Sequence, residues 1–503
     1  MRFSHKTQIV SLVFAYLAVA TLVCIYRFTQ PFTSEALTQF DIFYWMGQSR
    51  DIQLTGLVPV HNIWIFPSFN AFLSTIGHVD LFSVYLFGGA VVTTLAAIPL
   101  AGIVWVLTKD HRATLVTLLL YAAMQRILAR SVMYLPEAMT YLFGLTLLYL
   151  YVQLFRTRQW VRLIPIWLIT AGFVVLHQSG LNFLAFSAVV TVVFAFFFSG
   201  VSVKWRYIFG GIATALLALS VLIIKPVRVG LTFFLMKSNG TDKLAFQGDV
   251  IPFKQVVSAF DSFYIVLLIL SVVMISIYIF RKNPVWLKVS LGLLLLVALF
   301  YFSFLYILPS LNLYRLTPWR FYTWFSLFTI PIVGFGLGAI LQRVRLSNAL
   351  LIVALSSIIF LQVNTSLISD TMFTANRDTI QEMQKLVFPD QSIIFTTNAN
   401  YFQAKYALAL SSTNVQEIGA DFFRFPTSKI AWDLVKTLPK NNEDAFILIS
   451  KYQLRQRPSS IDYWRNSAVY DMNLNLFSDK KYFSKYFENA NLVVFQAKNT
   501  VES

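Results

Sequence analysis

Two carboxylates border long apolar runs, where acid–base chemistry at a membrane surface could take place. Asp41 follows the first apolar run in QFDIFYWMGQSRDIQ, and Glu137 follows Pro136 in ARSVMYLPEAMTYLF. A carboxylate beside aromatic side chains can have its pKa raised toward the working range of a general base. Each also has a structural interpretation, Asp41 as a helix N-cap and Glu137 as a negative charge that suits a helix N-terminus. The sequence leaves both interpretations open.

Basic and polar side chains at similar borders could bind a substrate. His177 in LHQSGLNF could hydrogen-bond a hydroxyl or a phosphate, although a lone histidine in a turn is more often a satisfied polar residue. Arg315 and Arg320, next to Trp319, could grip a phosphate bidentately or extend toward lipid headgroups. We therefore take Asp41 and Glu137 as candidate catalytic residues. The candidate substrate-binding residues are Arg320, Arg315, Arg130, His177 and Asp51.

These side chains interrupt a chain with the composition of a membrane protein. Of its 503 residues, 57% are hydrophobic, 16% aromatic and only 13% charged, and the mean hydropathy is +0.65. A soluble core cannot bury that much apolar surface. The net charge of +17 would suggest a nucleic-acid partner in a soluble protein, but here the positive charge gathers in short loops between apolar runs. The single cysteine, Cys24, excludes a disulfide framework and a cysteine-based metal site.

Eleven apolar runs are candidate membrane spans, which need about 20 residues, and two of them, 113–129 and 162–176, are short. The predicted spans are residues 9–26, 81–107, 113–129, 137–155, 162–176, 181–199, 206–224, 258–280, 286–307, 320–341 and 348–366. The N-terminal run has a basic start, as a signal peptide has, but no small-residue cleavage site follows it. We therefore predict an uncleaved first span.

Short basic loops alternate with longer mixed loops along the chain. The basic set contains Lys109, Arg112, Arg156, Arg158, Arg162, Lys204, Arg206, Arg281, Lys282, Lys288, Arg343 and Arg345. The positive-inside rule makes these loops cytoplasmic. The N-terminus is then cytoplasmic, whereas the first loop at 27–80 and everything after about residue 367 lie outside.

Two of the outer loops have features of their own. In the first, the apolar run from Ile63 to Ile76 is too short to span and is broken by Pro67, which predicts an interfacial helix on the outer leaflet. The loop at 225–257 has the length of a lid or substrate loop. The sequence does not show whether that loop moves.

The composition changes after residue 367. Strand-like runs SIIFTT, AFILIS and NLVVFQ alternate with helix-like stretches NYFQAKYALAL and SKIAWDLVKTL. We predict a transmembrane domain at 1–367 and an α/β domain at 368–503, large enough for its own core. Whether this second domain recognises a substrate or only caps the bundle stays open.

The order of these features resembles the GT-C superfamily of integral membrane glycosyltransferases. The resemblance rests on short segments: FDIFYWMGQ in the first outer loop, FPSFNAFLSTIG before the second span, RSVMYLPEAMTYLFGLTLLYLY, HQSG, RFYTWFSLFTIPIVGFGLGAI, and an outward C-terminal domain. It covers essentially the whole chain in topology. It implies a polytopic α-helical membrane protein with about 11 spans, GT-C-like, and a small C-terminal extracytoplasmic α/β domain.

The resemblance also implies a function. A GT-C-like enzyme would be a hexosyl- or pentosyltransferase that moves a sugar, with inversion, from a polyprenyl-phosphate donor in the lipid bilayer to a glycan, lipid or protein acceptor on the extracytoplasmic side. Asp41 is similar in position to the family's catalytic base or metal-proximal carboxylate, and Glu137 to its second-loop acid. Arg320 is placed nearest the donor phosphate, with Arg130 in reserve.

The cofactor is less well defined than the substrate. FDIFYW lacks the paired acids of metal-dependent members, and Pro136 precedes a single acid. A metal-independent mechanism is therefore favoured, and a divalent metal remains the alternative. No Walker motif, GxGxxG fingerprint, HExxH or GxSxG in its structural context occurs, which disfavours ATP-driven transport and nicotinamide chemistry.

Two functions from other classes remain as alternatives. A secondary transporter usually shows paired halves with interrupted spans near the midplane, but the sequence has no such halves and its charges gather at the outer ends of spans. An envelope scaffold protein would not depend on Asp41 or Glu137. It would also leave the length of the 225–257 loop unexplained.

Overall fold

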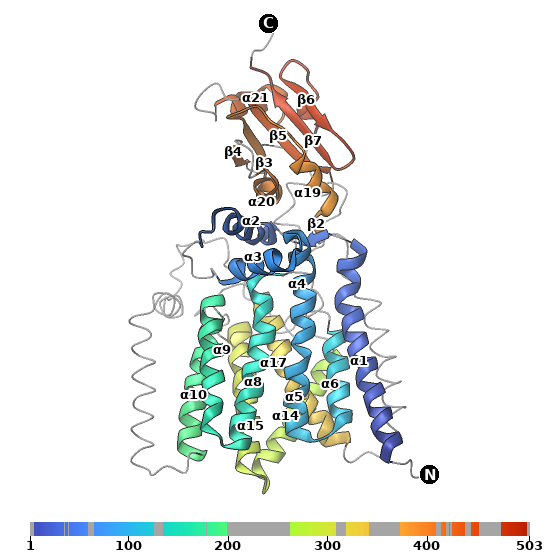
Figure 1. Ribbon diagram of the computed structural model, residues 1–503, viewed down its shortest axis with the longest axis vertical. Helices are drawn as coiled ribbons and strands as arrows, with labels where there is room; N and C mark the ends of the chain where they lie inside the picture. Colours follow the sequence, from blue (N-terminus) through green and yellow to red (C-terminus); the bar gives the residue numbers. More distant parts are fainter. Residues whose placement is uncertain are drawn as a thin grey trace.

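A bundle of helices carries a small α/β domain at one end in the computed structural model of this protein (Figure 1). The structure describes residues 5–34, 36–38, 40–58, 65–124, 134–177, 179–198, 262–307, 318–341, 373–408, 414–418, 422, 425–437, 444–451 and 474–499. Within these ranges, six helical stretches are long and apolar enough to cross a membrane. The protein is therefore a polytopic helical membrane protein.

The described helices coincide with all the predicted spans except 206–224 and 348–366, which lie outside the described residues. The helices are α1 (His5–Ser34), α4 (Leu81–Leu95), α5 (Ala97–Thr108), α6 (His111–Ala123), α8 (Pro136–Thr157), α9 (Leu163–Leu176), α10 (Gly180–Phe198), α14 (Ser262–Phe280), α15 (Val285–Phe302) and α17 (Pro318–Leu341). Helices α4 and α5 together form the second predicted span. Helix α1 continues to Ser34, so Arg27 lies in a helix and not in the predicted loop.

Helix α17 lies inside the bundle and is the most deeply buried of the described spanning helices, with 83% of its apolar window buried. Its GFGLG sequence lets neighbouring helices approach closely. A Cβ atom at Gly336 would lie 2.1 Å from Ser271 Oγ of α14, and one at Gly334 would lie 2.4 Å from Thr117 Oγ1 of α6. Glycine is therefore required at these positions, as at many contacts between membrane helices.

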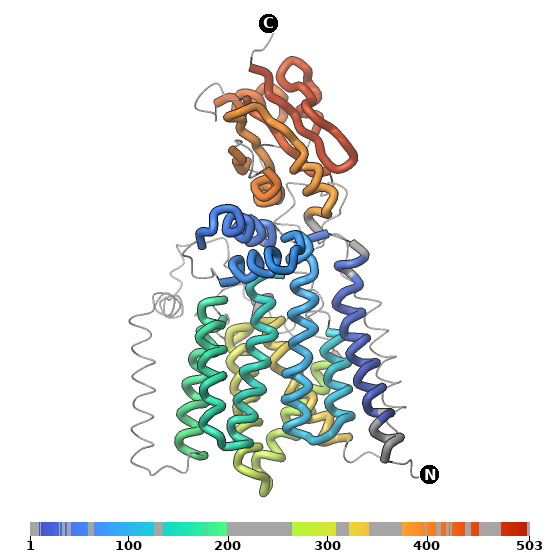
Figure 2. Tube along the Cα trace, in the orientation of Figure 1, coloured from blue at the N-terminus to red at the C-terminus, as the bar shows by residue number. Residues whose placement is uncertain are grey.

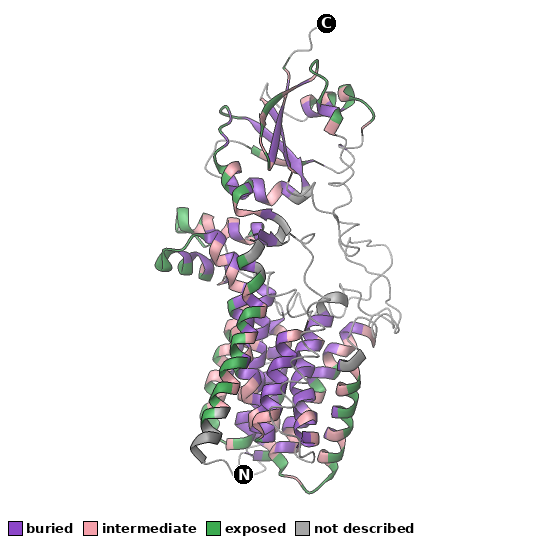
Figure 3. Ribbon diagram, turned by 90° about the vertical axis from the view of Figure 1, so that its right-hand side faces the viewer, coloured by how far each residue is buried: buried purple, intermediate pink, exposed green. Residues whose placement is uncertain are grey.

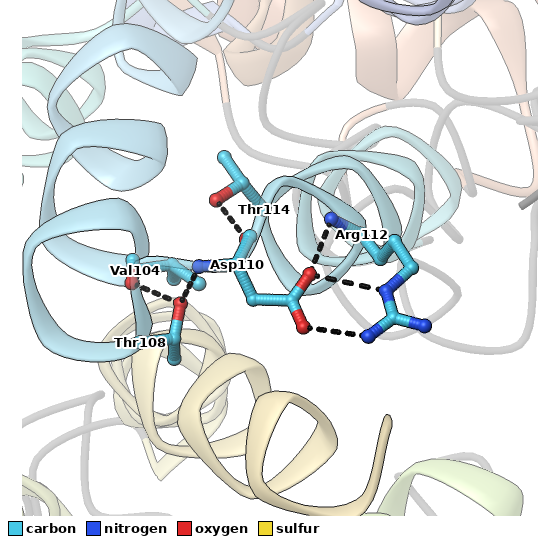
Figure 4. A network of polar contacts seen from close by, with 5 residues as sticks. All are labelled: Val104, Thr108, Asp110, Arg112 and Thr114. Atoms are coloured by element: carbon cyan, nitrogen blue, oxygen red, sulfur yellow. Dashed lines mark hydrogen bonds and ion pairs between the residues drawn. The ribbon is translucent and has the colours of Figure 1, made fainter. Parts of the chain in front are cut away.

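The turn between α5 and α6 shows how a basic loop is built at the end of the bundle away from the α/β domain (Figure 4). Asp110 caps α6 by accepting from the Arg112 N–H at 2.8 Å, and Arg112 Nη2 lies 3.2 Å from Asp110 Oδ2. The start of α1 and the turns after α8 and α14 lie at the same end (Figure 1). The described basic loops thus share one end of the bundle, and its assignment to the cytoplasm stays a prediction.

Two helices lie across the opposite end, between the bundle and the α/β domain (Figures 1 and 3). These are α2 (Phe40–Thr55) and α3 (Ile65–Gly77). Pro67 does not break α3, because it falls in the first turn, where a helix does not use the backbone N–H that proline lacks. Phe72 and Ile76 leave 57% and 64% of their surfaces exposed. The short apolar helix predicted in the first outer loop is confirmed.

The C-terminal domain is a mixed sheet in the order β4-β3-β5-β7-β6. Strand β3 (Ile393–Thr397) pairs in parallel with β4 (Asn414–Ile418) and β5 (Ala445–Ser450), while β7 (Leu492–Ala497) is antiparallel to β5 and to β6 (Phe483–Glu488). Helices α19 (Arg377–Gln384) and α20 (Asn398–Ala407) pack on one face and α21 (Ser428–Thr437) on the other. The predicted α/β domain is confirmed.

This domain does not stand apart from the bundle. Strand β1 (Ala36–Thr38), just after α1, pairs antiparallel with β2 (Phe373–Asn376), where the C-terminal domain begins. In Figure 2 the blue N-terminal trace and the orange start of the C-terminal domain meet at this point. A single hydrophobic cluster contains Phe43 of α2, Tyr85 of α4 and Ile394 of β3. The segment between α1 and α4 and the α/β domain therefore share one core.

Candidate active site

Helix α2 places Asp41 at the end of the bundle that faces the C-terminal domain. The helix starts at Phe40, so Asp41 falls inside the first turn and not at the N-cap position. A carboxylate in the first turn is favoured by the helix dipole. Only the backbone position of Asp41 belongs to the described structure, so its role as a base stays a prediction.

A buried network of hydroxyl and amide groups fixes α2 on α3 and α4. Ser49 Oγ lies 2.8 Å from the Tyr85 hydroxyl and donates to the Pro67 carbonyl oxygen at 3.0 Å. The Tyr134 hydroxyl donates to Asn70 Oδ1 at 3.0 Å. All five side chains are buried, and a buried polar group is costly unless it is bonded. The network therefore holds the helix that carries Asp41 in one position.

Glu137 occupies the first turn of α8, directly after Pro136, as its helix interpretation predicted. It is also buried, with 8% of its surface exposed. Its neighbours Leu135 and Ala138 belong to the same hydrophobic cluster as Phe43 of α2. The structure thus brings the segments of Asp41 and Glu137 to one end of the bundle and into one cluster, while the catalytic role of Glu137 stays a prediction.

His177 is buried in the predicted turn between α9 and α10 and is connected to α8. The Ser179 N–H donates to His177 Nδ1 at 3.1 Å, so Nδ1 is an acceptor and the neutral ring carries its proton on Nε2. Ser179 Oγ lies 2.7 Å from His177 Nδ1 and 3.0 Å from Thr140 Oγ1, one turn after Glu137 on α8. The histidine ring is 6.3 Å from Trp324 of α17, centroid to centroid.

The remaining predicted residues are placed unevenly. Arg320 lies in the first turn of α17, but its side chain falls outside the described structure, as do Arg315 and Arg130 altogether. Asp51 is on α2 with 66% of its side chain exposed, and its Oδ1 lies 3.7 Å from Arg50 Nη2. The substrate-binding roles of all five predicted residues, His177 included, stay predictions.

Sequence reasoning missed the charged contacts that join α2 and α4 to the C-terminal domain. The Arg50 guanidinium carbon lies 4.7 Å from the Tyr406 ring centroid, and burial lowers the pKa of Arg50. Arg377 Nη1 lies 3.2 Å from Asp80 Oδ2, and its Nη2 donates to Ser83 Oγ at 2.7 Å. An arginine without a recognisable motif around it gives no sequence signal for such contacts.

Metal binding was left open by the sequence. Among the described residues, no group of three or more His, Cys, Asp and Glu side chains is arranged to hold a metal ion. The side chain of Asp41 lies outside the described structure, so the metal-independent mechanism stays a prediction.

Comparison with known proteins identifies the architecture. No family model and no curated protein sequence matches the chain. Solved structures do match. The oligosaccharyltransferase of Archaeoglobus fulgidus, in complex with zinc and sulfate, superposes with a TM-score of 0.54 at 13% identity, over 95% of this chain and 72% of that one.

ArnT from Cupriavidus metallidurans, bound to undecaprenyl phosphate, superposes with a TM-score of 0.53 at 11% identity over 99% of both chains. Its apo form gives 0.51 at 13% identity, over 99% of this chain and 98% of that one. The chain has the GT-C fold. The GT-C resemblance drawn from short motifs is thereby confirmed for the architecture.

Proposed function

We propose that this GT-C protein is a membrane glycosyltransferase. It moves a hexosyl or pentosyl group from a polyprenyl-phosphate donor to a glycan, lipid or protein acceptor at the end of the bundle that carries the α/β domain. The observation that supports this most directly is the position of α2, which holds Asp41 in its first turn and lies between the membrane helices and the C-terminal domain (Figure 3). A donor in the bilayer and a polar acceptor can meet only at such a boundary.

The proposed reaction is a single displacement with inversion. The acceptor hydroxyl oxygen forms the new bond to the anomeric carbon while the bond from that carbon to the phosphate oxygen breaks. The Asp41 carboxylate takes the acceptor proton, and the electron pair leaves with the polyprenyl phosphate. Arg320 at the start of α17 stabilises the negative charge on the leaving phosphate. Glu137, buried at the start of α8, is the second carboxylate of the proposed site besides Asp41.

The choice of a lipid donor is supported by one of the structural neighbours. ArnT was solved with undecaprenyl phosphate bound. A polyprenyl phosphate would reach the same end of this bundle laterally from the bilayer. The exposed apolar side chains Phe72 and Ile76 of α3 lie at that end, where a helix can rest on the lipid.

The test is sugar transfer by the purified full-length protein in lipid nanodiscs. A panel of radiolabelled polyprenyl-phosphate sugars is offered together with membrane-extracted acceptors. We expect wild type to consume at least one donor and Asp41→Asn to lose about 100-fold or more in rate, the usual contribution of a general base. Glu137→Gln is measured in parallel.

Asp378→Asn is the matched control, because Asp378 is an exposed aspartate in the first turn of α19 in the C-terminal domain. It should leave transfer unchanged. A chelator arm tests the metal: activity that falls with chelator and returns with a divalent ion assigns a metal, and unchanged activity assigns a metal-independent mechanism. If folded wild type consumes no donor, the proposed function is wrong. If Asp41→Asn transfers sugar at the wild-type rate, Asp41 is not the general base.

A further inference from the structure

Arg27 is a fully buried arginine inside the membrane-spanning part of α1. Its side chain has 0% of its surface exposed, although Ile25 beside it is 52% exposed. It therefore points into the bundle and does not extend to the lipid headgroups, as arginines near helix ends usually do. An ionisable side chain at this depth is costly, and such residues usually have a function.

Part of the Arg27 charge has a structural explanation. Its Nη2 donates to the Tyr121 carbonyl oxygen at 2.7 Å, and the guanidinium carbon lies 5.0 Å from the Tyr121 ring centroid. Tyr121 is in the last turn of α6, where carbonyl groups are free and the helix dipole favours a cation. The arginine thus caps α6 from a neighbouring helix.

This cap uses only one edge of the guanidinium. Arg27 Nε and Nη1 are both buried and have no hydrogen-bond partner, and neither has Thr94 Oγ1 on the adjoining α4. In the described part of the chain, no carboxylate forms an ion pair with Arg27. Three N–H groups of the buried guanidinium are therefore left without an acceptor. The free-energy penalty of burying them unbonded is larger than the stabilisation from the single bond to the Tyr121 carbonyl.

The position of Arg27 is suited to a lipid phosphate. It lies seven residues before the end of α1, which is about 10 Å along the helix axis from the end that faces the C-terminal domain. Helix α1 packs on α4 and α6, and only 17% of its apolar window is buried, so among the described helices it lies at the edge of the bundle (Figure 1).

We propose that Arg27 is the anion-binding residue of a lipid-phosphate site at the seam of α1, α4 and α6. This rests on the proposed function insofar as polyprenyl phosphate is the carrier. A guanidinium matches a phosphate because its planar fork offers several N–H donors to several oxygens. In the arrangement described here no space adjoins Nε or Nη1, so binding requires α1 to separate from α6 at this level. Arg27 closes the seam in the empty protein and holds the phosphate in the loaded one.

The test measures lipid binding without sugar or acceptor, so it is independent of transfer. Full-length protein in detergent is titrated with undecaprenyl phosphate, undecaprenol or phosphatidylglycerol, and bound lipid is counted by native mass spectrometry. We expect undecaprenyl phosphate to bind wild type at least about tenfold more tightly than undecaprenol, and Arg27→Met to lose that difference. Arg27→Lys keeps a cation at the α6 terminus without the fork, and we expect intermediate affinity with near wild-type thermal stability.

Arg281→Met is the control, since Arg281 is an exposed arginine in the turn between α14 and α15. It should bind like wild type. Equal affinity of phosphatidylglycerol and undecaprenyl phosphate, with the same dependence on Arg27, would assign the site to phospholipid headgroups and keep its phosphate chemistry. If both Arg27 variants bind undecaprenyl phosphate with wild-type affinity, or if wild type binds undecaprenol as tightly as undecaprenyl phosphate, the proposed site is wrong. Arg27 then only caps α6. Neither result bears on whether Asp41 supports transfer.

Discussion

The guanidinium group of Arg50 lies over the ring of Tyr406, 4.7 Å from carbon to centroid, and this contact joins α2 to α20 of the C-terminal domain. Phe43, seven residues earlier on α2, packs against the same ring at 6.4 Å. The helix that positions Asp41 is thus held from above by the C-terminal domain and from below by α3 and α4. The α/β domain therefore contacts the helix that carries Asp41 directly.

Replacing Tyr406 should therefore disturb both stability and transfer. Tyr406→Leu removes the ring under Arg50, and we expect it to cost about 0.5–2 kcal/mol of stability and to lower transfer by loosening α2. Tyr406→Phe keeps the ring and should retain most of both. Thermal unfolding in nanodiscs and transfer assays are compared. Equal losses in the two variants would show that the hydroxyl matters and the ring does not.

The contact between Arg377 and Asp80 should contribute modestly. Their side chains are 30% and 52% exposed, so solvent screens the pair and we expect about 0.5–1 kcal/mol from a double-mutant cycle of Arg377→Met and Asp80→Asn. Arg377→Met by itself should lower the stability by more than this pair energy, because it also removes the hydrogen bond to Ser83. High salt should weaken the pair. Lys385→Met, an exposed lysine that follows α19, serves as control. A cycle energy near zero would contradict an ion-pair contribution.

The bond between Asn70 and Tyr134 should show the asymmetry of buried polar pairs. Asn70→Leu leaves the buried Tyr134 hydroxyl without its acceptor and should destabilise the protein by about 1–3 kcal/mol. Adding Tyr134→Phe removes the stranded hydroxyl, and we expect the double variant to recover part of the loss. The measurement is thermal unfolding of the four proteins in nanodiscs. If the stability losses of the two single variants simply add in the double variant, the bond between Asn70 and Tyr134 does not contribute to stability.

The glycines of the bundle should respond differently to alanine. A Cβ atom at Gly336 would meet Ser271 Oγ at 2.1 Å, so Gly336→Ala must push α14 from α17 and should cost about 1–3 kcal/mol. At Gly292 on α15 a Cβ atom has nothing within 4 Å. Gly292→Ala should be neutral or stabilise by about 0.5–1 kcal/mol. The amount of folded protein after mild heating distinguishes the two variants, and similar values for both would refute the close approach.

The β6–β7 hairpin should lose an interaction in acid. Hydrogen bonds from Lys451 and Lys485 lower the pKa of Glu488 from 4.5 to about 2. Because the folded-state value is depressed, this stabilisation is complete above pH 4.5 and is lost as the pH falls toward 2. We expect the difference in Tm between wild type and Glu488→Gln to shrink over that range. A difference that stays constant with pH would indicate that the charge does not contribute.

Much of the architecture followed from the sequence because membrane insertion depends on local composition. A run such as 181–199 must form a helix, since a backbone in lipid has no other way to satisfy its polar groups, and the structure places α10 there almost to the residue. The strands AFILIS and NLVVFQ were equally recognisable by their apolar, β-branched runs. The parallel strand β4 was missed, because NVQEI is short and mostly polar.

The site was only partly predictable for a physical reason. Asp41, Glu137 and His177 were recognisable because a polar residue at the end of an apolar run is easily seen in a sequence. The structure places their segments at the end of the bundle that faces the C-terminal domain. Arg50 and Arg377 did not stand out, because what matters about them is a partner several hundred residues away along the chain. The local sequence around an arginine does not indicate such a distant partner.

The sequence by itself determined that the chain crosses a membrane several times, where most of its helices begin and end, and that an α/β domain follows. Local hydrophobicity and strand propensity suffice for these features. The tertiary structure alone decided that β1 pairs with β2, that α20 rests on α2, and that Arg27 turns inward to cap α6. These depend on which surfaces meet after the helices have assembled, and the free energy of those contacts exists only in the packed molecule.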